Sequence, residues 1–224
     1  MPEYNQLYHK AYFAKRIGND PKRAATFRSE KEFIVEYINS GILLDVGCST
    51  GEFLDTLKWD GPKYGMEISD YAAAIAKEKG ILFDRDLFNS QRYFDIIIFR
   101  GTIQHIDTPF LYMKKAYDAL KPGGYLIFLA TPNTNSIYYK LWNTLPFLDA
   151  PINFYIPSDK TLINALKNFG FTLVKIRYPY FKSAYASPLK DHVNFVRKLF
   201  GMKIAFPFWG NSMDLIFKKP ISKD

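Results

Sequence analysis

The segment LLDVGCSTGEFL, residues 43–54, is the strongest structural signal in the chain. It begins with the apolar run of residues 42–46, which is typical of a strand buried on both faces, and Asp45 lies at the end of that run. Gly47 and Gly51 flank the turn that follows, and residues 52–58 are predicted to form a helix. Glycines let a ligand lie against the main chain where a helix begins. The segment therefore predicts a ligand-binding turn between a strand and a helix.

Two common phosphate-binding motifs are absent from this turn. The chain has no G-x-x-x-x-G-K-[ST] sequence, and G-C-S-T-G lacks the central glycine of G-x-G-x-x-G. A nucleoside triphosphate and a pyrophosphate-bridged dinucleotide are therefore disfavoured as ligands.

Strand and helix patterns alternate on both sides of this segment. Ser29 and Glu32 form a capping-box pattern for a helix that residues 39–41 end, and Ser69 or Asp70 is predicted to cap another helix. Further helices are predicted after Thr108 and after Ser158. Strands are predicted at residues 42–46, 63–68, 81–83, 94–99, 125–131, 171–178 and 213–219. This alternation predicts an α/β fold, a three-layer sandwich around parallel strands.

Length and composition favour one soluble domain. The chain has 224 residues and a single cysteine, which excludes an internal disulfide and a Cys-based zinc site. No apolar run is long enough to span a membrane, and the first residues do not resemble a signal peptide. We expect a cytoplasmic protein, monomeric or homodimeric. The expected organisation within residues 1–224 is an N-terminal helical lid (1–28), a ligand-binding core (29–178), an aromatic and basic insertion that covers the substrate (179–211) and a last strand (212–219).

Glu67 is the second candidate ligand-binding residue. It ends the strand that follows the glycine turn, 22 residues after Asp45. An acidic side chain at this place can accept hydrogen bonds from both hydroxyls of a ribose. The alternative is an ordinary solvated carboxylate at the end of a strand.

Together these motifs resemble the class I S-adenosylmethionine-dependent methyltransferases, of the type that acts on small molecules. LLDVGCSTG is similar to the family's first motif and YGMEIS to its second. FDIIIFRGTIQHI and LKPGGYLIFLATPN resemble the later motifs, in the family's order. The resemblance covers residues 25–178, and GNSMDLIFKKP resembles the last strand. It implies a Rossmann-like, seven-stranded, mostly parallel sheet whose last strand is antiparallel.

The resemblance also implies the residues that bind S-adenosylmethionine and its product S-adenosylhomocysteine. Glu67 would hold the ribose, and Ile68 would pack on the adenine. Asp86 and Leu87 would meet the adenine edge, with Asp84 as the competing acid. The methionine side of the site would be formed by the glycine turn and the end of the fourth strand: Asp45, Gly47, Cys48, Ser49, Gly51, Arg100 and Gly101. Cys48 is expected to serve as a small side chain in the turn, not as a nucleophile.

His105 is the candidate catalytic base. Methyl transfer is an in-line displacement, which gains most from holding the acceptor and the methyl group collinear. A hydroxyl acceptor would also profit from a base, and related enzymes have a histidine in this loop. A purely structural histidine is the alternative. The loop RGTIQHID contains Asp107 as its single acid, so we expect no metal site.

The flanks of the chain suggest the acceptor. Residues 1–31 carry a net charge of +4 and residues 175–224 of +7, which leaves −3 of the total +8 for the middle. Tyr8, Tyr12 and Arg16 recur at helical spacing and are candidate substrate-binding residues. These features favour a small acceptor that is anionic or glycosylated, and nucleic acid is not the expected partner.

Two other functions stay open. The basic flanks permit an RNA methyltransferase, although no RNA-binding module and no N/D-P-P-[YF] motif are visible. A non-catalytic module that only binds the cofactor is the third possibility. The acidic residues at positions 45 and 67 argue against it, because an inactive domain does not need carboxylates that bind the ribose of the cofactor.

Overall fold

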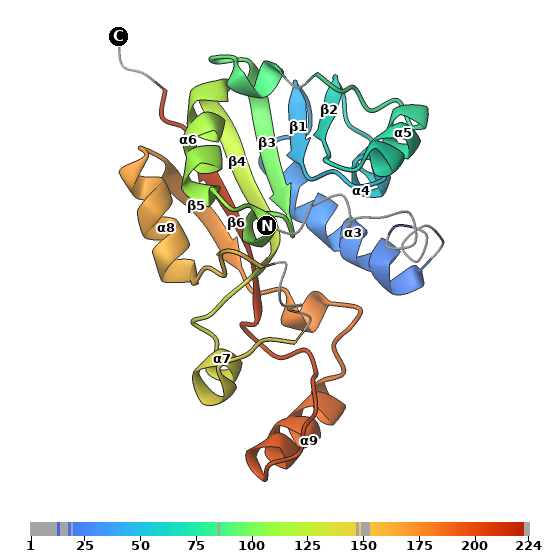
Figure 1. The fold of residues 1–224 in the computed structure, drawn as a ribbon, viewed down its shortest axis with the longest axis vertical. Helices are drawn as coiled ribbons and strands as arrows, with labels where there is room; N and C mark the ends of the chain where they lie inside the picture. Colours follow the sequence, from blue (N-terminus) through green and yellow to red (C-terminus); the bar gives the residue numbers. More distant parts are fainter. Residues whose placement is uncertain are drawn as a thin grey trace.

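A computed structural model describes residues 13, 18, 20–84, 86–146, 148 and 153–221 of the chain. Over these residues the strands form one six-stranded sheet in the order β2-β1-β3-β4-β6-β5 (Figure 1). The strands are β1 (Leu43–Val46), β2 (Lys63–Met66), β3 (Phe94–Arg100), β4 (Leu120–Pro132), β5 (Thr172–Arg177) and β6 (Ser212–Lys218).

The sheet has the direction pattern expected from the sequence. β1 pairs in parallel with β2 and with β3, and β3 pairs in parallel with β4. β6 lies between β4 and β5 and is antiparallel to both. The predicted antiparallel last strand is therefore confirmed.

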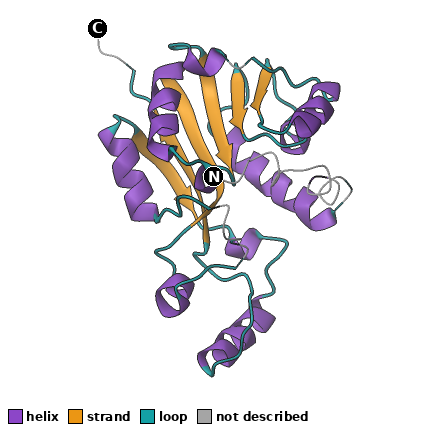
Figure 2. Ribbon diagram, viewed as in Figure 1, coloured by secondary structure: helices purple, strands orange, loops and turns teal. Residues whose placement is uncertain are grey.

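Helices cover both faces of the sheet, as Figure 2 shows. The α-helices are α3 (Pro21–Val35), α4 (Glu52–Thr56), α5 (Asp70–Glu78), α6 (Pro109–Ala119), α7 (Ile137–Trp142), α8 (Asp159–Asn168) and α9 (Pro188–Leu199); the 3₁₀ turns are η1 (Leu87–Asn89), η2 (Ile103–His105) and η3 (Tyr180–Lys182). Apolar residues of α3, α4 and α5 form one core cluster with the sheet, and those of α6 and α8 form the other. Successive residues of β3 point to opposite faces of the sheet, so Ile97 packs in the cluster with α6 and α8 and Ile98 packs in the cluster with α3, α4 and α5. The three-layer α/β sandwich is thus confirmed.

The prediction of seven strands was wrong by one strand. Residues 81–83 form a single bridge, between Leu82 and Tyr64, in place of a strand. The Leu82 amide donates to the Lys63 carbonyl at 2.9 Å, and the Leu82 carbonyl accepts from the Gly65 amide at 2.8 Å. The apolar run has only three residues, and the charged sequence D-R-D comes directly after it. The run is therefore too short to form a longer ladder of strand hydrogen bonds.

The first described helix begins earlier than the capping-box pattern at Ser29 predicts. α3 begins at Pro21, and the Asp20 side chain caps it by accepting from the Lys22 amide at 2.9 Å. Proline is favoured at the first position of a helix because its missing N–H would have no partner there. Ser29 lies inside α3, so one continuous helix crosses the expected boundary between residues 28 and 29, and it ends at Val35, before the expected stop.

A third, smaller apolar cluster lies beyond the edge of the sheet where β4 ends and β6 begins. We call residues 137–145 and 179–211 the cap. Tyr138 of α7 and Phe206 lie in its centre with their rings 5.2 Å apart, and Phe195 of α9 stacks on Phe208 at 4.6 Å. The aromatic residues of the C-terminal third therefore build this cluster. In Figure 1 the cap projects away from the sheet, with α9 at its far end.

Two largely buried arginines join α3 to the sheet. Arg100, at the end of β3, donates to the two carboxylate oxygens of Glu30 at 2.7 and 3.2 Å. Arg177 of β5 donates to Asp214 of β6 at 2.8 Å and also to the Ser29 carbonyl at 3.1 Å. Both guanidinium groups also lie over phenylalanine rings of α3, Arg100 over Phe27 and Arg177 over Phe33. The position of α3 thus depends on charged groups as well as on apolar packing.

No helix among the described residues is long and apolar enough to cross a membrane.

We predict that Glu30→Ala lowers the free energy of unfolding by about 3 kcal/mol, because it leaves the Arg100 guanidinium unpaired at a largely buried position. Urea denaturation followed by circular dichroism measures this change. Asp118→Ala is the matched control, since it breaks the exposed Lys114–Asp118 pair and should cost less than about 1 kcal/mol. Equal losses in the two variants would show that the Glu30–Arg100 pair has no special role.

Candidate functional site

The glycine turn lies at the carboxyl end of β1, between β2 and β3. The amides of Gly47 and Cys48 both donate to the Met66 carbonyl, at 2.7 and 3.0 Å, which ties the turn to β2. Gly47 has a φ of +83°, and a Cβ at this residue would lie 2.5 Å from Cγ2 of Thr102. Position 47 therefore accepts only glycine, and Thr102, just after β3, packs directly on the turn.

The Glu67 carboxylate joins the glycine turn to the beginning of α5. One of its oxygens accepts from the Ser49 amide at 3.0 Å, and the other accepts from the Ser69 amide at 2.9 Å. Burial raises the pKa of Glu67, and these backbone hydrogen bonds oppose that effect. The side chain is half-buried, and a carboxylate can accept more hydrogen bonds than these backbone amides supply.

Asp45 is buried and incompletely bonded. Its Oδ1 has no hydrogen-bond partner among the described residues, and the side chain is 2% exposed. Burial raises the pKa of Asp45 to about 7; the positive charge of Arg100 lowers it, and the negative charges of Glu67 and Glu30 raise it further. A buried carboxylate without a partner is costly, so its presence at this turn indicates a place for a polar or cationic ligand group.

The remaining residues of the turn have different surroundings. Cys48 is buried in the apolar cluster under α4 and α5, and burial raises the pKa of its thiol, which does not suit a nucleophile. Ser49 has a φ of +53°, and its buried hydroxyl lacks a partner among the described residues. Gly51 has a φ of +72° at the first position before α4. The Thr50 hydroxyl is also buried without a partner among the described residues, so the turn contains main-chain groups and two unpartnered hydroxyls.

The predicted adenine-contacting residues follow β2 or the bridge at Leu82 in the chain. Ile68 is 53% exposed, although it is a large apolar residue at the end of a strand. Leu87 begins η1 and packs against the core cluster that includes α6. Asp86 is exposed, and its amide donates to the Asp84 carboxylate at 3.0 Å. Both acids are therefore in the same turn, and the choice between them stays a prediction.

Arg100 and Gly101 end β3 next to the glycine turn. The Arg100 guanidinium is engaged by Glu30, so this side chain supports α3, and its charge acts on Asp45 through space. The Gly101 amide donates to the Leu129 carbonyl at 2.8 Å, and the Gly101 carbonyl accepts from Gln104 at 3.0 Å. Both main-chain groups of Gly101 thus have partners within the chain, and its contact with the cofactor stays a prediction.

His105 lies in η2, on the same edge of the sheet as the glycine turn. Its amide donates to the carbonyl of Thr102, the residue that packs on Gly47, at 2.8 Å. The Gln104 side-chain amide lies 3.3 Å from Nε2 of the His105 ring. The Gln104 carbonyl accepts from the amides of Phe154 and Tyr155 at 2.8 and 3.3 Å. These main-chain hydrogen bonds hold the segment of Phe154 and Tyr155 against η2, which contains His105.

Several of these contacts were not predicted from the sequence. Thr102, Gln104 and Tyr155 have no sequence pattern that identifies them, because their roles depend on contacts between segments distant in the chain. The sequence also did not predict the bulge in β4 at Ala130. This residue has a φ of +49°, and its amide donates to the Asp214 carboxylate. The predicted substrate-binding residues Tyr8, Tyr12 and Arg16 lie outside the described residues.

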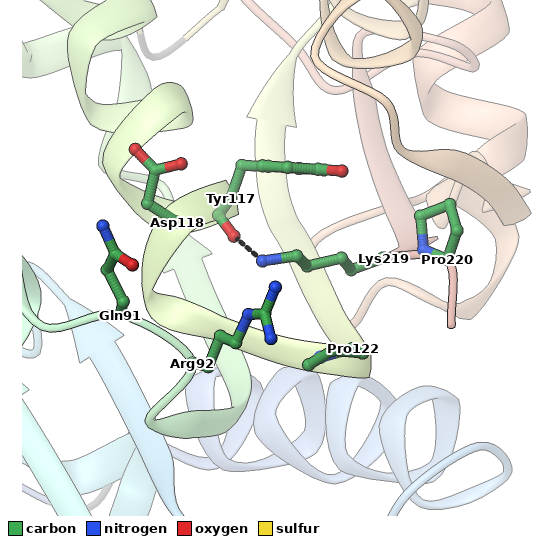
Figure 3. A pocket seen from close by; sticks show the side chains of 7 residues that line it. All are labelled: Gln91, Arg92, Tyr117, Asp118, Pro122, Lys219 and Pro220. Carbon is green, nitrogen blue, oxygen red and sulfur yellow. Dashed lines mark hydrogen bonds between the residues drawn. The ribbon is translucent and has the colours of Figure 1, made fainter. Parts of the chain in front are cut away.

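A shallow pocket on the opposite edge of the sheet contains none of the predicted site residues (Figure 3). Arg92, Tyr117 and Lys219 are among its lining residues, and the Lys219 ammonium donates to the Tyr117 and Leu120 carbonyls. This lysine therefore joins the end of β6 to the connection between α6 and β4. Across the described residues, no group of three or more His, Cys, Asp or Glu side chains is arranged to hold a metal ion.

Comparison of the whole sequence with protein families gives one clear result. A family model described as a methyltransferase domain matches residues 15–176. The tRNA U34 carboxymethyltransferase of Desulfotalea psychrophila is 25% identical over 143 residues, which cover 58% of this chain and 45% of that protein. The ubiquinone biosynthesis O-methyltransferase of Mesorhizobium japonicum is 26% identical over 137 residues, 56% of this chain and 50% of the relative. The chain spans about half the length of these curated relatives.

Solved structures with the same fold cover nearly the whole chain. An S-adenosylmethionine-dependent methyltransferase from Archaeoglobus fulgidus superposes with a TM-score of 0.62 at 20% identity, over 97% of this chain and 100% of that one. A possible histamine N-methyltransferase from Thermotoga maritima gives a TM-score of 0.63 at 20% identity, over 96% and 95% of the two chains. Together with the match over residues 15–176, this establishes that the chain belongs to the S-adenosylmethionine-dependent methyltransferase family.

Proposed function

We propose that this methyltransferase methylates a hydroxyl group of a small acceptor that is anionic or contains a sugar, with His105 as the base and without a metal ion. The observation that carries this proposal is the contact between the two loops. His105 is bonded to Thr102, and Thr102 packs on Gly47 of the turn that contains the candidate cofactor residues. A base that accepts a proton from the acceptor has to lie within hydrogen-bond reach of it, and this contact holds the His105 segment close to the turn.

The residues of the turn fit the cofactor. When bound, S-adenosylmethionine supplies a methyl group on a positively charged sulfur. Asp45 has an unpartnered carboxylate oxygen for a cationic or polar group of the ligand, and Glu67 has lone pairs for ribose hydroxyls. Gly47 lets Thr102 pack directly on the turn, and exposed Ile68 offers an apolar surface for a flat ring. Asp86 and Leu87 would complete the adenine side.

Gln104 would prepare His105 for its role. The Gln104 amide donates one hydrogen to the Gly101 carbonyl at 3.0 Å, which directs the second hydrogen toward Nε2 of His105. This arrangement favours the neutral tautomer in which Nε2 carries the lone pair. At 3.3 Å the contact is long, so an acceptor hydroxyl can replace Gln104 there and transfer its proton to Nε2.

The nature of the acceptor is inferred from the surroundings of His105. The main chain of Phe154 and Tyr155 is held beside this loop, and the Phe154 side chain is 49% exposed. The C-terminal region from residue 175 carries a net charge of +7. Asp107, the single carboxylate of the loop after β3, is exposed and accepts from the Thr108 hydroxyl at 3.1 Å. One exposed carboxylate is a poor metal site, which supports a reaction without a metal.

RNA methylation is the second candidate. One relative is named as a tRNA U34 carboxymethyltransferase, and the basic flanks would suit a polyanion. An assay of S-adenosylhomocysteine formation with hydroxylated carboxylates, nucleotide-linked sugars, their neutral counterparts and tRNA separates the candidates. The proposal predicts turnover of an anionic or sugar-containing small molecule, and turnover of tRNA alone or of neutral acceptors alone would contradict it.

We predict that Glu67→Ala weakens the binding of S-adenosylmethionine by about 10²-fold, because two charge-assisted hydrogen bonds to the ribose are lost. Isothermal titration calorimetry measures the dissociation constant. Glu78→Ala, which removes an exposed carboxylate of α5, should bind like the wild type. Unchanged binding by Glu67→Ala would contradict the assignment of the ribose to Glu67.

We also predict that binding of S-adenosylmethionine weakens as the pH falls below about 7. Asp45 has a pKa of about 7 in the folded chain, so below that pH a proton must leave before the carboxylate can hold a cationic group. The affinity should then fall about 10-fold for each further pH unit. Titrations at several pH values test this, and Asp45→Asn should remove most of the dependence. An affinity that is constant across this range in the wild type would count against a cation at Asp45.

For the base, we predict that His105→Ala lowers kcat by about 10²-fold and leaves the KM for S-adenosylmethionine unchanged, because the imidazole acts on the acceptor and not on the cofactor. The assay uses saturating amounts of the best acceptor from the panel above. His192→Ala, at an exposed position of α9, is the control. A His105→Ala variant that keeps the wild-type kcat is incompatible with a catalytic role.

A further inference from the structure

The last helix of the cap, α9, has two faces of different character. On the inner face Asp191 and Asn194 are buried, and Phe195 stacks on Phe208. The outer face has large apolar side chains in contact with solvent. Leu189 is 89% exposed and Phe200 is 86% exposed, and Val193 and Val196 are about half exposed. These four residues follow the spacing of one helical face, and we call them the apolar stripe.

Other exposed apolar side chains of the cap extend this surface. Phe181 in η3 is 71% exposed, and Leu199 and Met202, near the end of α9, are 54% and 53% exposed. Single exposed apolar residues are normal, but a helical face formed by them together with neighbours of the same kind indicates an interaction surface. The core of the cap is complete without them, because Tyr138, Leu145 and Phe206 are already buried in it.

The charges around the stripe are of one sign. Residues 179–211, all of which the structure describes, contain five basic residues and one acid, Asp191. Asp191 is 3% exposed and accepts from the Tyr180 hydroxyl at 2.9 Å and the Ser187 amide at 2.7 Å. This segment therefore presents no carboxylate to solvent. Four of its basic side chains are exposed: Lys182, Lys190, Arg197 and Lys203.

We propose that α9 binds the surface of an anionic lipid bilayer, with the apolar stripe among the acyl chains and the basic residues against the head groups. A helix with large apolar residues on one face and lysine and arginine beside it has the composition of a helix that lies in the membrane interface. A second copy of this chain would bring equal positive charges together. The stripe is mainly aliphatic, which suits acyl chains and does not suit stacking on nucleic-acid bases.

The position of α9 gives this binding a consequence for the site. The cap continues from the ends of β4 and β5 and the beginning of β6, which share the edge of the sheet that carries the glycine turn. Docking through α9, at the far end of the cap in Figure 1, would place this edge toward the bilayer. The binding itself requires neither cofactor nor acceptor, so it can be tested separately from the proposed methyl transfer.

Sedimentation with vesicles tests the proposal. The chain should bind phosphatidylcholine vesicles that contain phosphatidylglycerol, and bind pure phosphatidylcholine at least 10-fold more weakly because about 1 kcal/mol per basic residue is lost. Raising the ionic strength to about 0.5 M should weaken binding to the anionic vesicles. The double variant Leu189→Ser, Phe200→Ser should bind them about 10²-fold more weakly, about 10-fold for each side chain.

Leu111→Ser is the matched control, since Leu111 is 51% exposed on α6, and it should bind like the wild type. Circular dichroism verifies that all variants are folded. Failure of the wild type to bind anionic vesicles would overturn the proposal, as would equal binding by the double variant. Light scattering that finds a wild-type dimer and a monomeric double variant would also overturn it, because the stripe would then be an interface between two copies.

Discussion

The hydrogen bonds of one carboxylate organise the site. Glu67 accepts from the Ser49 amide and the Ser69 amide, so a single side chain fixes the glycine turn after β1 relative to the beginning of α5. Neither amide has a partner within a strand or helix at that point, and a buried amide without a partner is costly. The same carboxylate is the candidate partner of the ribose. We infer that it shapes the turn in the absence of the cofactor and that the cofactor then binds to a turn already in place.

Charged groups near the turn connect this site to the rest of the fold. Arg100 pairs with Glu30 of α3 and lowers the pKa of Asp45, while Arg177 pairs with Asp214 and reaches the main chain of the same helix. Removing α3 would therefore leave Arg100 without its carboxylate partner, take from Arg177 its hydrogen bond to the Ser29 carbonyl, and change the charge around Asp45. This links the helix before β1, which the sequence motifs do not include, to the electrostatics of the candidate cofactor site. The cap has its own aromatic cluster, and it also contacts the start of α3, because the Tyr185 hydroxyl donates to the Asp20 carboxylate at 3.2 Å.

Local patterns predicted most of the fold, and contacts between distant segments explain what they missed. The buried strands, the capped helix after Ser158 and the antiparallel β6 were all predicted correctly, because apolar periodicity and capping residues act over a few positions. The short bridge at Leu82 was not predicted, since it depends on pairing with β2. The start of α3 at Pro21 was missed although its signal is local, the Asp20 cap followed by a proline, because the capping-box pattern at Ser29 was preferred. At the candidate site, the sequence suggested Asp45, Glu67 and His105, whose roles stay predictions. It could not place Arg100 on Glu30 or Thr102 on Gly47, because these contacts join segments that are far apart in the chain.

The central claim is that the turn of residues 47–51 and the Glu67 carboxylate form the cofactor site. A map of amide chemical shifts, recorded by nuclear magnetic resonance while S-adenosylhomocysteine is added to the full chain, tests it most directly. Our account predicts the largest changes at the amides of residues 47–51 and 67–69, with saturation at a stoichiometry of one. The absence of changes there, or changes centred on Arg92 and Lys219 at the opposite edge of the sheet, would contradict it.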